Sequence, residues 1–224
     1  MSNTRLALFA ALSLVCIAWS AAALYAQIVR WSHQNLIEQI RNHSTLLEPA
    51  TLDAAITRYN HTLTILPCAM QIHEDLGLLL ALRTDSIMQT PNLDAEADAF
   101  DAMHSALSNL LACTPTNGKA WLDLATISLY REGFTKDTAH AYVMSGKVTP
   151  VESWLAEKRL IFILPFVALL SAEEHRIIAN DLATLTLAHP NRINAVMAAA
   201  KVDSKAALAR LLGQPSTTPK LQAP

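Results

Sequence analysis

Histidines paired with carboxylates at helical spacing are the residues of this sequence best suited to chemistry. Asp101 precedes His104 by three positions and Asp137 precedes His140 by the same spacing, so each pair shares one face of a helix. A bound metal ion needs several converging ligands, and the sequence holds no HxxxH or HExxH motif. We therefore expect surface hydrogen bonding from both pairs, and we predict neither a metal site nor a cofactor.

Motifs for nucleophilic catalysis or nucleotide binding are missing from the sequence. No GxSxG, P-loop or dinucleotide-binding pattern occurs, and the carboxylates form no recognisable acid–base pair. The 17 basic residues are outnumbered by 19 acidic ones, which gives no electrostatic basis for binding nucleic-acid phosphates. We predict a non-enzymatic protein that binds no nucleic acid. The alternative is an accessory or catalytic helical domain that uses the His/Asp pairs.

Cys68 and Cys113 are candidates for a disulfide bond. Each follows the end of a predicted helix, at equivalent ends of successive hairpins, and stacking of the hairpins would bring these ends together. In an oxidising compartment the bond closes a loop of about 45 residues, worth roughly 4 kcal/mol on the chain-entropy model. The alternative is two buried thiols.

Lys158 and Arg159 follow Trp154 by about one helical turn and form a second candidate site. Their cationic groups suit an anionic ligand or the acidic residues of a protein partner. The alternative is that they end an amphipathic surface beside Glu157. We take Trp154, Lys158 and Arg159 as the candidate partner surface.

The elements that position these residues begin with an apolar segment over 6–29. Its polar residues are Ser13, Ser20 and Gln27, and about 20 apolar residues in a helix cross a bilayer core of about 30 Å. We predict a transmembrane signal anchor over 6–29, preceded by a short tail over 1–5. A signal peptide cleaved near Ala21–Ala23 is the alternative, although the apolar run continues beyond those residues.

Charge orients this anchor weakly, because Arg5 precedes the segment while Arg30 and Arg41 follow it. A short tail before a long domain favours insertion with the N-terminus inside the cell. We therefore predict a single-pass protein of the inner (cytoplasmic) membrane, with its main domain outside the cytoplasm, in the periplasm if the cell is bacterial.

Helix is expected to continue from the membrane through a stalk over 30–48, because no helix breaker precedes Pro49. The apolar residues of the stalk lie roughly on one face: Trp31, Leu36, Ile40 and Leu47. That face either packs on the chain's own domain or pairs with a second copy. A structural membrane protein that forms a homodimer through the stalk is therefore an open alternative.

An all-α domain is predicted over 49–213, followed by a disordered tail over 214–224. Glycine is scarce, with 5 residues, and period-two alternation of Val, Ile and Thr is missing, so sheet is not expected. Gly133 is expected at the turn that follows a helix, because glycine adopts positive φ freely. Capping signals place helix starts at Thr149–Glu152 and Ser171–Glu174. In the first of these, Thr149 is the expected N-cap and Glu152 the residue that reaches back to it.

The apolar run over 160–170 has two interpretations, a second membrane span or a buried core helix. Charged residues flank it on both sides, and Pro165 lies inside it. A run of this length is too short for a span, so we expect a core helix. Pro165 should kink or end that helix near Leu164.

One complete helical hairpin is predicted between Pro115 and Pro150, and Trp154 begins the next helix. The pattern resembles the tetratricopeptide repeat family, in which a Trp early in helix A is followed by a Leu and a small residue, and a Pro follows helix B. The matching residues are Trp121, Leu124, Ala125 and Pro150. The resemblance covers roughly 50–190. It implies a short solenoid of antiparallel hairpins whose concave face holds a segment of a protein partner.

A second resemblance is to small signal-anchored helical proteins of bacterial exopolysaccharide gene clusters. The residues that carry it are Trp121-Leu122, Arg131–Phe134, Trp154 and Lys158-Arg159. It implies a non-enzymatic scaffold or adaptor in the assembly or export of envelope polysaccharide, with membrane or envelope proteins as partners.

Overall fold

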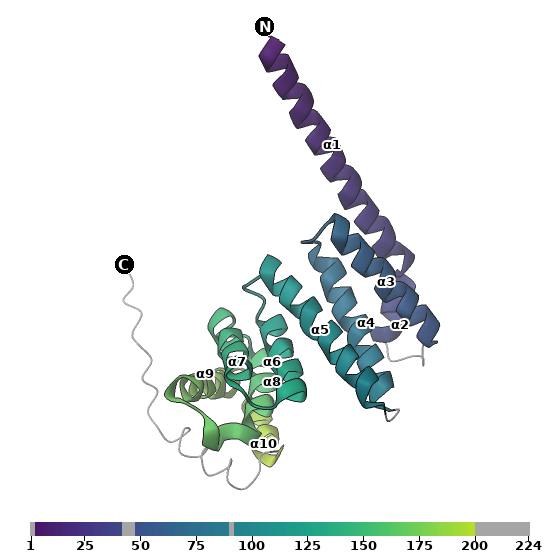
Figure 1. Ribbon diagram of the computed structural model, residues 1–224. Coiled ribbons are helices and arrows are strands. Elements are labelled where there is room, and N and C mark those ends of the chain that lie inside the picture. The colour runs from purple at the N-terminus through teal and green to yellow at the C-terminus, as the bar shows by residue number, and fades with distance from the viewer. Residues whose placement is uncertain (1–2, 42–47, 90–91, 200–224) are drawn as a thin grey trace, which may run out of the picture. The chain divides into compact units, whose positions relative to one another are not determined.

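A computed structural model of the chain describes residues 3–41, 48–89 and 92–199, and the regular elements within them are all helices (Figure 1). The prediction of an all-α fold is confirmed for this part of the chain. Two compact units divide the chain, Met1–Cys113 (unit 1) and Thr114–Pro224 (unit 2). The region predicted as one domain over 49–213 is thus divided at Cys113. The predicted tail over 214–224 lies outside the described residues.

Unit 1 consists of a long N-terminal helix and a group of helices packed around its end. Its helices are α1 (Asn3–Ser32), α2 (Gln34–Arg41), α3 (Pro49–Ile65), α4 (Met70–Met88) and α5 (Leu93–Cys113). Short connections place α3, α4 and α5 beside one another in antiparallel order (Figure 1). Pro49 stands at the start of α3, where a missing N–H breaks no helical hydrogen bond.

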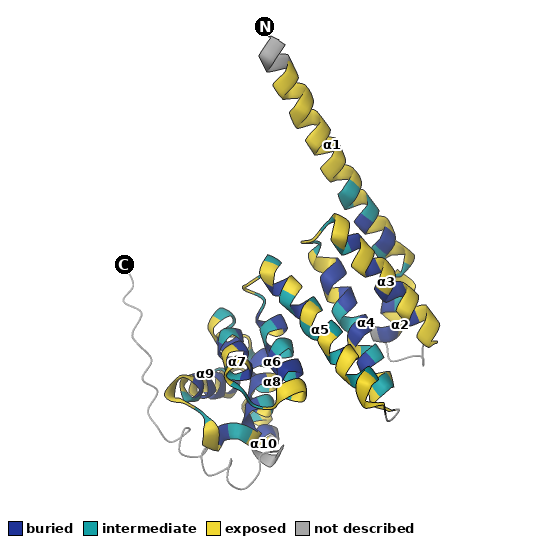
Figure 2. Ribbon diagram, in the orientation of Figure 1, coloured by how far each residue is buried: buried dark blue, intermediate teal, exposed yellow. Residues whose placement is uncertain are grey.

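Residues 7–21 of α1 are mostly apolar and are exposed (Figure 2). Within the described residues, Ala7–Ser32 is the one helix long and apolar enough to cross a membrane, with a mean hydropathy of 2.2. Every residue from 7 to 21 is exposed. Among the residues that the structure describes, none therefore covers the apolar side chains of this part of α1.

The last turns of α1 belong to the core of unit 1. Ala26 and Val29 are buried in the same cluster as Ile37 and Ile40 of α2. The helix does not run unbroken into the predicted stalk, because a turn at His33 separates α1 from α2. Because Ile37 and Ile40 of α2 are buried in this cluster, α2 packs into the core of unit 1 and is not a free stalk.

The centre of unit 1 lies between α3 and α4. Tyr59, Leu76 and Leu79 are almost wholly buried there. On α4 the buried apolar residues recur at the spacing of one helix face: Ile72, Leu76, Leu79 and Leu80. Burying such a face supplies most of the stability of a helix in a protein of this kind.

Unit 2 is built from hairpins around a single apolar cluster. Its elements are α6 (Gly118–Glu132), α7 (Lys136–Val148), α8 (Ser153–Ile163), a 3₁₀ helix (Leu164–Leu169), α9 (Ala172–Ala188) and α10 (Pro190–Ala199). The cluster includes Tyr142 of α7, Leu155 and Leu160 of α8, and Ile178 of α9, all fully buried. Gly146 allows a close approach, because a Cβ there would collide with the side chain of Ile177.

Two of the expected local signals in unit 2 are confirmed. Gly133 ends α6 with φ of 79°, a conformation that only glycine adopts readily. Ser171 and Glu174 form the expected capping box at the start of α9: the Ser171 hydroxyl accepts hydrogen bonds from backbone N–H groups of the first turn, and the Ser171 N–H donates to the Glu174 carboxylate.

The capping box expected at Thr149–Glu152 is wrong. Thr149 is the C-cap of α7, where its hydroxyl donates to the Ser145 carbonyl oxygen over 2.8 Å. Helix α8 begins only at Ser153, with Glu152 as an N-cap whose side chain makes no capping bond. Thr149 is held at the end of the preceding helix because its polar atoms accept hydrogen bonds from Arg159.

The apolar run over 160–170 is a core segment, as expected. Helix α8 ends at Ile163, and the chain continues as a 3₁₀ helix that contains Pro165. Leu160, Ile163 and Leu164 are buried in the unit 2 cluster. The proline thus ends the α-helix at the place where its ring would disrupt the helical ladder.

Prolines mark every second helix boundary across both units. Helices α3, α5, α7 and α9 are each followed, two residues after their last residue, by a proline: Pro67, Pro115, Pro150 and Pro190. A proline at this position cannot extend the preceding helix and favours a turn. Each proline thus stands at the turn into the next helix, the turn that repeats from hairpin to hairpin.

Candidate functional site

Trp154 and Lys158 lie one turn apart on the exposed face of α8. The Lys158 Nζ atom is 5.5 Å from the centroid of the Trp154 ring, which is the geometry of a cation–π contact. Trp154 is 44% exposed, a large fraction for a tryptophan. Two of the three residues of the candidate partner surface are therefore accessible and in contact with each other.

Arg159 is not part of that surface, and its inclusion there was wrong. Its side chain is fully buried and forms a two-bond ion pair with Asp181 of α9, at 2.9 Å from Nε to Oδ2 and 2.5 Å from Nη2 to Oδ1. Adjacent residues on a helix point about 100° apart. Lys158 can therefore face solvent while Arg159 enters the core.

The remaining guanidinium protons of Arg159 bind the end of α7. Nη1 donates to the Thr149 hydroxyl over 3.2 Å and to the Ser145 carbonyl over 3.3 Å, and Nη2 donates to the Thr149 carbonyl over 3.2 Å. Arg159 thus ties α8 to both α7 and α9. This network is structural, because its charged groups are enclosed and already paired.

The surroundings of Asp181 shift its ionisation. Burial raises the pKa of the Asp181 carboxyl to about 6, although the Arg159 guanidinium acts in the opposite direction. The neighbouring Tyr142 is fully buried, and burial raises the pKa of its phenol well above the ordinary value. Within the described part of the chain, the Tyr142 hydroxyl finds no hydrogen-bond partner.

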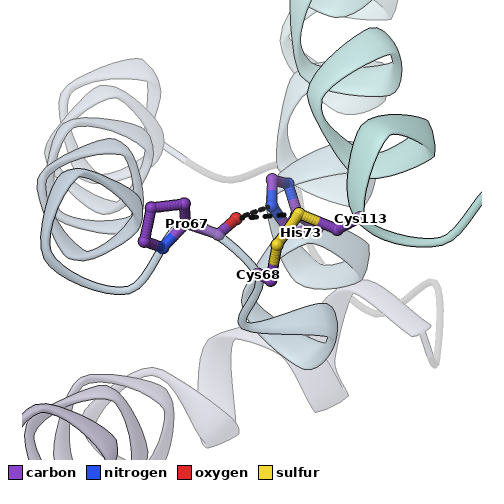
Figure 3. Close-up of a disulfide and its surroundings, with 4 residues drawn as sticks. All are labelled: Pro67, Cys68, His73 and Cys113. Carbon is purple, nitrogen blue, oxygen red and sulfur yellow. Dashed lines mark hydrogen bonds between the residues drawn. A yellow bond between two sulfur atoms is a disulfide. The ribbon is translucent and has the colours of Figure 1, made fainter. Parts of the chain in front are cut away.

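Cys68 and Cys113 form the expected disulfide, which joins the turn after α3 to the end of α5 (Figure 3). Their Cα atoms are 5.4 Å apart, within the range that a disulfide bridges without backbone movement. The Cys113 Sγ atom also lies 3.5 Å from the Pro67 carbonyl oxygen. A disulfide sulfur has no proton to donate, so this is a contact rather than a hydrogen bond.

His73 supports the turn that carries Cys68 (Figure 3). Its Nε2 atom lies 2.6 Å from the Pro67 carbonyl oxygen. Since a carbonyl can only accept, Nε2 carries the proton and donates it. His73 is buried on α4, so it fixes the carbonyl that precedes the cysteine.

A cavity lies where α1, α2 and α4 meet, and we refer to it as the α1–α2 cavity. Its volume is about 460 Å³, and it is open to solvent. Apolar side chains of α1, including Leu24 and Ile28, line one part of it. The rest of the lining includes Arg30, Glu38 and Asp75, so apolar and charged groups share one space.

Arg30 holds the base of this cavity together. Its Nε atom donates to Oδ2 of Asp75 over 3.2 Å, and Nη1 donates to the Gln71 side-chain oxygen over 2.9 Å. Asp75 is buried on α4, whereas Arg30 is 38% exposed. Burial and the Asp75 charge raise the pKa of the nearby Tyr59 phenol to about 12. The pair therefore fixes the end of α1 to α4.

The His/Asp pairs are separate features on different helices. The His140 ring meets the Trp121 ring edge to face, at 6.0 Å between centroids. The His104 carbonyl accepts a hydrogen bond from Ser108. Across the described residues, the structure brings together no group of three or more side chains of the types that bind metals.

Asp75, Asp181 and the α1–α2 cavity were not anticipated from the sequence. Each aspartate lies on the apolar face of its helix, next to a leucine in the sequence, and a buried carboxylate requires a cationic partner. That requirement was a signal available in the sequence. It indicates that some arginine points inward, but it does not identify which one.

Comparison of the chain with models of protein families, with curated proteins and with solved structures gave no match.

Proposed function

We propose that this chain is a membrane-anchored, non-enzymatic helical scaffold whose two units lie outside the cytoplasm and bind a protein partner. The main support is how α1 changes character along its length. Its first part is apolar and exposed, whereas Ala26 and Val29 near its end are buried in unit 1. A bilayer would cover the first part, and unit 1 would then be held against the membrane without a flexible linker.

The disulfide supports placing the domain that follows α1 on the non-cytoplasmic side of the membrane. Disulfides persist in oxidising compartments and are rare in the reducing cytosol. The Cys68–Cys113 bond lies in the part of unit 1 that follows α1. In a bacterial cell these features together favour the inner membrane with both units in the periplasm.

The Trp154–Lys158 pair is the proposed partner-binding surface of unit 2. An exposed tryptophan in contact with a lysine offers both apolar area and charge, and tryptophan is enriched among residues that dominate binding energy. The resemblance to tetratricopeptide repeats adds an expectation of an extended partner segment. A role in envelope polysaccharide assembly rests on the second resemblance alone.

Anchoring and topology are tested with the full chain in cells. We expect it to stay in the membrane pellet after alkaline carbonate extraction, and we expect the mass of the mature chain to include residues 1–23. A reporter that is active only in the cytoplasm, fused after Pro224, should be silent. An active reporter would overturn the placement, and a mature chain that begins after Ala23 would show a cleaved signal peptide.

Partner binding is tested with a photocrosslinking residue at position 154 in membranes. A matched control is position 187, because Leu187 is a highly exposed apolar residue on α9. We expect a discrete crosslinked species from position 154, and we expect Lys158→Glu to weaken it. Equal crosslinking from both positions, or none from position 154, would contradict the proposed surface.

A further inference from the structure

We infer that the α1–α2 cavity binds the headgroup of a phospholipid that carries both a phosphate and a primary ammonium group, as phosphatidylethanolamine does. This inference rests on the proposed function, because it requires α1 to lie in a bilayer. Three features support it: the level in the bilayer at which the cavity would lie, the arrangement of its apolar and polar walls, and the charges of its lining.

The position of the cavity along α1 coincides with the headgroup layer. A helix rises about 1.5 Å per residue, so residues 7–25 span about 28 Å, close to the hydrocarbon thickness of about 30 Å. Arg30 then lies about 7 Å beyond the hydrocarbon edge, whereas the headgroup layer extends about 5–7 Å per leaflet. Leu24 at one end of the cavity therefore meets acyl chains, and Arg30 meets phosphates.

The walls of the cavity follow the same order. Leu24 and Ile28 line the cavity from α1, and both are exposed. Leu24 lies at the hydrocarbon edge, and Ile28 lies about one turn further along, within the headgroup layer. Trp31, which also lines the cavity, is 77% exposed, and tryptophan is enriched at membrane interfaces. Polar groups of Gln34 and Glu38 lie on α2, after the turn at His33. One phospholipid can therefore place its chain along α1 and its headgroup beside α2.

The charges select the kind of headgroup. Arg30 is the cation of the lining, and its charge is largely offset by its ion pair with Asp75. Glu38 is an exposed carboxylate of the lining, and it accepts a hydrogen bond from Gln34 over 3.0 Å. An anionic headgroup without an ammonium group offers the Glu38 carboxylate no cationic partner. A primary ammonium group gives the Glu38 carboxylate hydrogen bonds, while the attached phosphate meets the part of Arg30 that faces the cavity.

The probe is phosphatidylethanolamine with a photoreactive acyl chain, compared with the same chain on phosphatidylglycerol and phosphatidylcholine. The full chain is reconstituted in phosphatidylcholine vesicles that contain one probe at a time, and labelled protein is counted by mass spectrometry. We expect at least fivefold more labelling by phosphatidylethanolamine than by either other probe. The labelled peptide should come from the end of α1 or from α2.

Two variants of Glu38 provide the decisive comparison. Glu38→Gln should reduce labelling by phosphatidylethanolamine about fivefold, and Glu38→Arg should reverse the preference in favour of phosphatidylglycerol. Glu48→Gln is the matched control, since Glu48 is an exposed carboxylate before α3 whose side chain makes no capping bond. It should leave the preference unchanged.

Equal labelling by the three probes, or labelling that is insensitive to both Glu38 variants, would overturn the lipid site. Flotation of the protein with the vesicles is measured in the same samples. Protein that floats but shows no preference leaves the anchor intact and refutes only the site. Protein that does not float refutes the anchor and the site together.

Discussion

Removing either partner of the buried Arg159–Asp181 pair should destabilise unit 2, and the two removals should not cost the same. Arg159→Met leaves the Asp181 carboxylate in the core without its cation. Asp181→Leu leaves the guanidinium there without its anion. Both charged groups are fully buried in the native chain, so solvent cannot replace the missing partner.

The magnitudes follow from what each remaining group can do. The loss of one partner from a buried pair typically costs about 3–5 kcal/mol. In Arg159→Met the carboxyl can take up a proton, which at pH 7 costs about 4 kcal/mol for a group whose ordinary pKa is 3.8. Protonation therefore limits the loss of stability in Arg159→Met. In Asp181→Leu the guanidinium cannot become neutral, because arginine does not deprotonate in proteins, so the loss of stability should be larger.

The double variant Arg159→Met, Asp181→Leu removes both charges and fills part of their space with apolar atoms. We expect it to be more stable than Asp181→Leu alone, with a coupling free energy of at least about 2 kcal/mol. The measurement is urea unfolding of the full chain in a mild detergent, together with amide hydrogen exchange. Exchange in α8 and α9 reports unit 2, and exchange in α3 and α4 serves as the internal control. Losses that add within about 0.5 kcal/mol would refute the coupling.

The same pair gives a dependence on pH. Burial raises the pKa of Asp181 to about 6 in the folded chain, above the ordinary value of 3.8. A carboxyl with a raised pKa holds its proton more tightly when folded, so its contribution to stability is complete below pH 3.8 and is lost as the pH rises through 6. The difference in unfolding free energy between the native chain and Asp181→Asn should therefore shift by about 2 kcal/mol in favour of the native chain from pH 7 to pH 4.

Three further predictions concern packing and the crosslink. Gly146→Ala should destabilise unit 2 by about 1–3 kcal/mol, because the new Cβ collides with the side chain of Ile177. Gly77→Ala has open space around its new Cβ and should stabilise α4 by up to about 1 kcal/mol. Urea unfolding measures both changes, and equal effects would contradict the packing. Tyr142→Phe should leave stability unchanged or raise it by up to about 1 kcal/mol in the same assay, since the hydroxyl is buried without a partner in the described structure; a loss above 1 kcal/mol would reveal a missed hydrogen bond. Alkylation of the denatured chain should find one free thiol before reduction and three after it, and three before reduction would exclude the disulfide. Reduction should lower the free energy of unfolding by about 4 kcal/mol.

Signals that act within one turn of a helix were predicted correctly. Gly133 and the Ser171–Glu174 box are examples, because the residues that satisfy each other lie a few positions apart and need no tertiary partner. The disulfide was also predicted correctly, since both cysteines follow helix ends at equivalent positions of successive hairpins. These features depend on spacing, which the sequence displays directly.

The errors have a common physical origin in long-range pairing. The residues at Thr149–Glu152 have the composition of a capping box, but Arg159 binds both polar oxygens of Thr149 and keeps it at the end of α7. Arg159 in turn points inward because Asp181, on another helix, provides its counter-charge. Composition identifies the candidates for a cap or a surface. The partner that decides between them lies far along the chain.

The boundary of the anchor shows the same principle for apolar residues. Leu24 and Val29 are both aliphatic, yet the first is exposed and the second is buried in unit 1. A side chain that faces lipid and one that faces a protein core have the same hydropathy. An apolar run by itself therefore cannot show where a membrane-facing segment ends and a protein core begins. The Arg30–Asp75 pair marks the change, because a charge paired with a buried carboxylate of α4 must lie within the domain. The predicted anchor over 6–29 thus includes about one turn that already belongs to the core of unit 1, and that shared turn would couple any tilt of the anchor directly to this core.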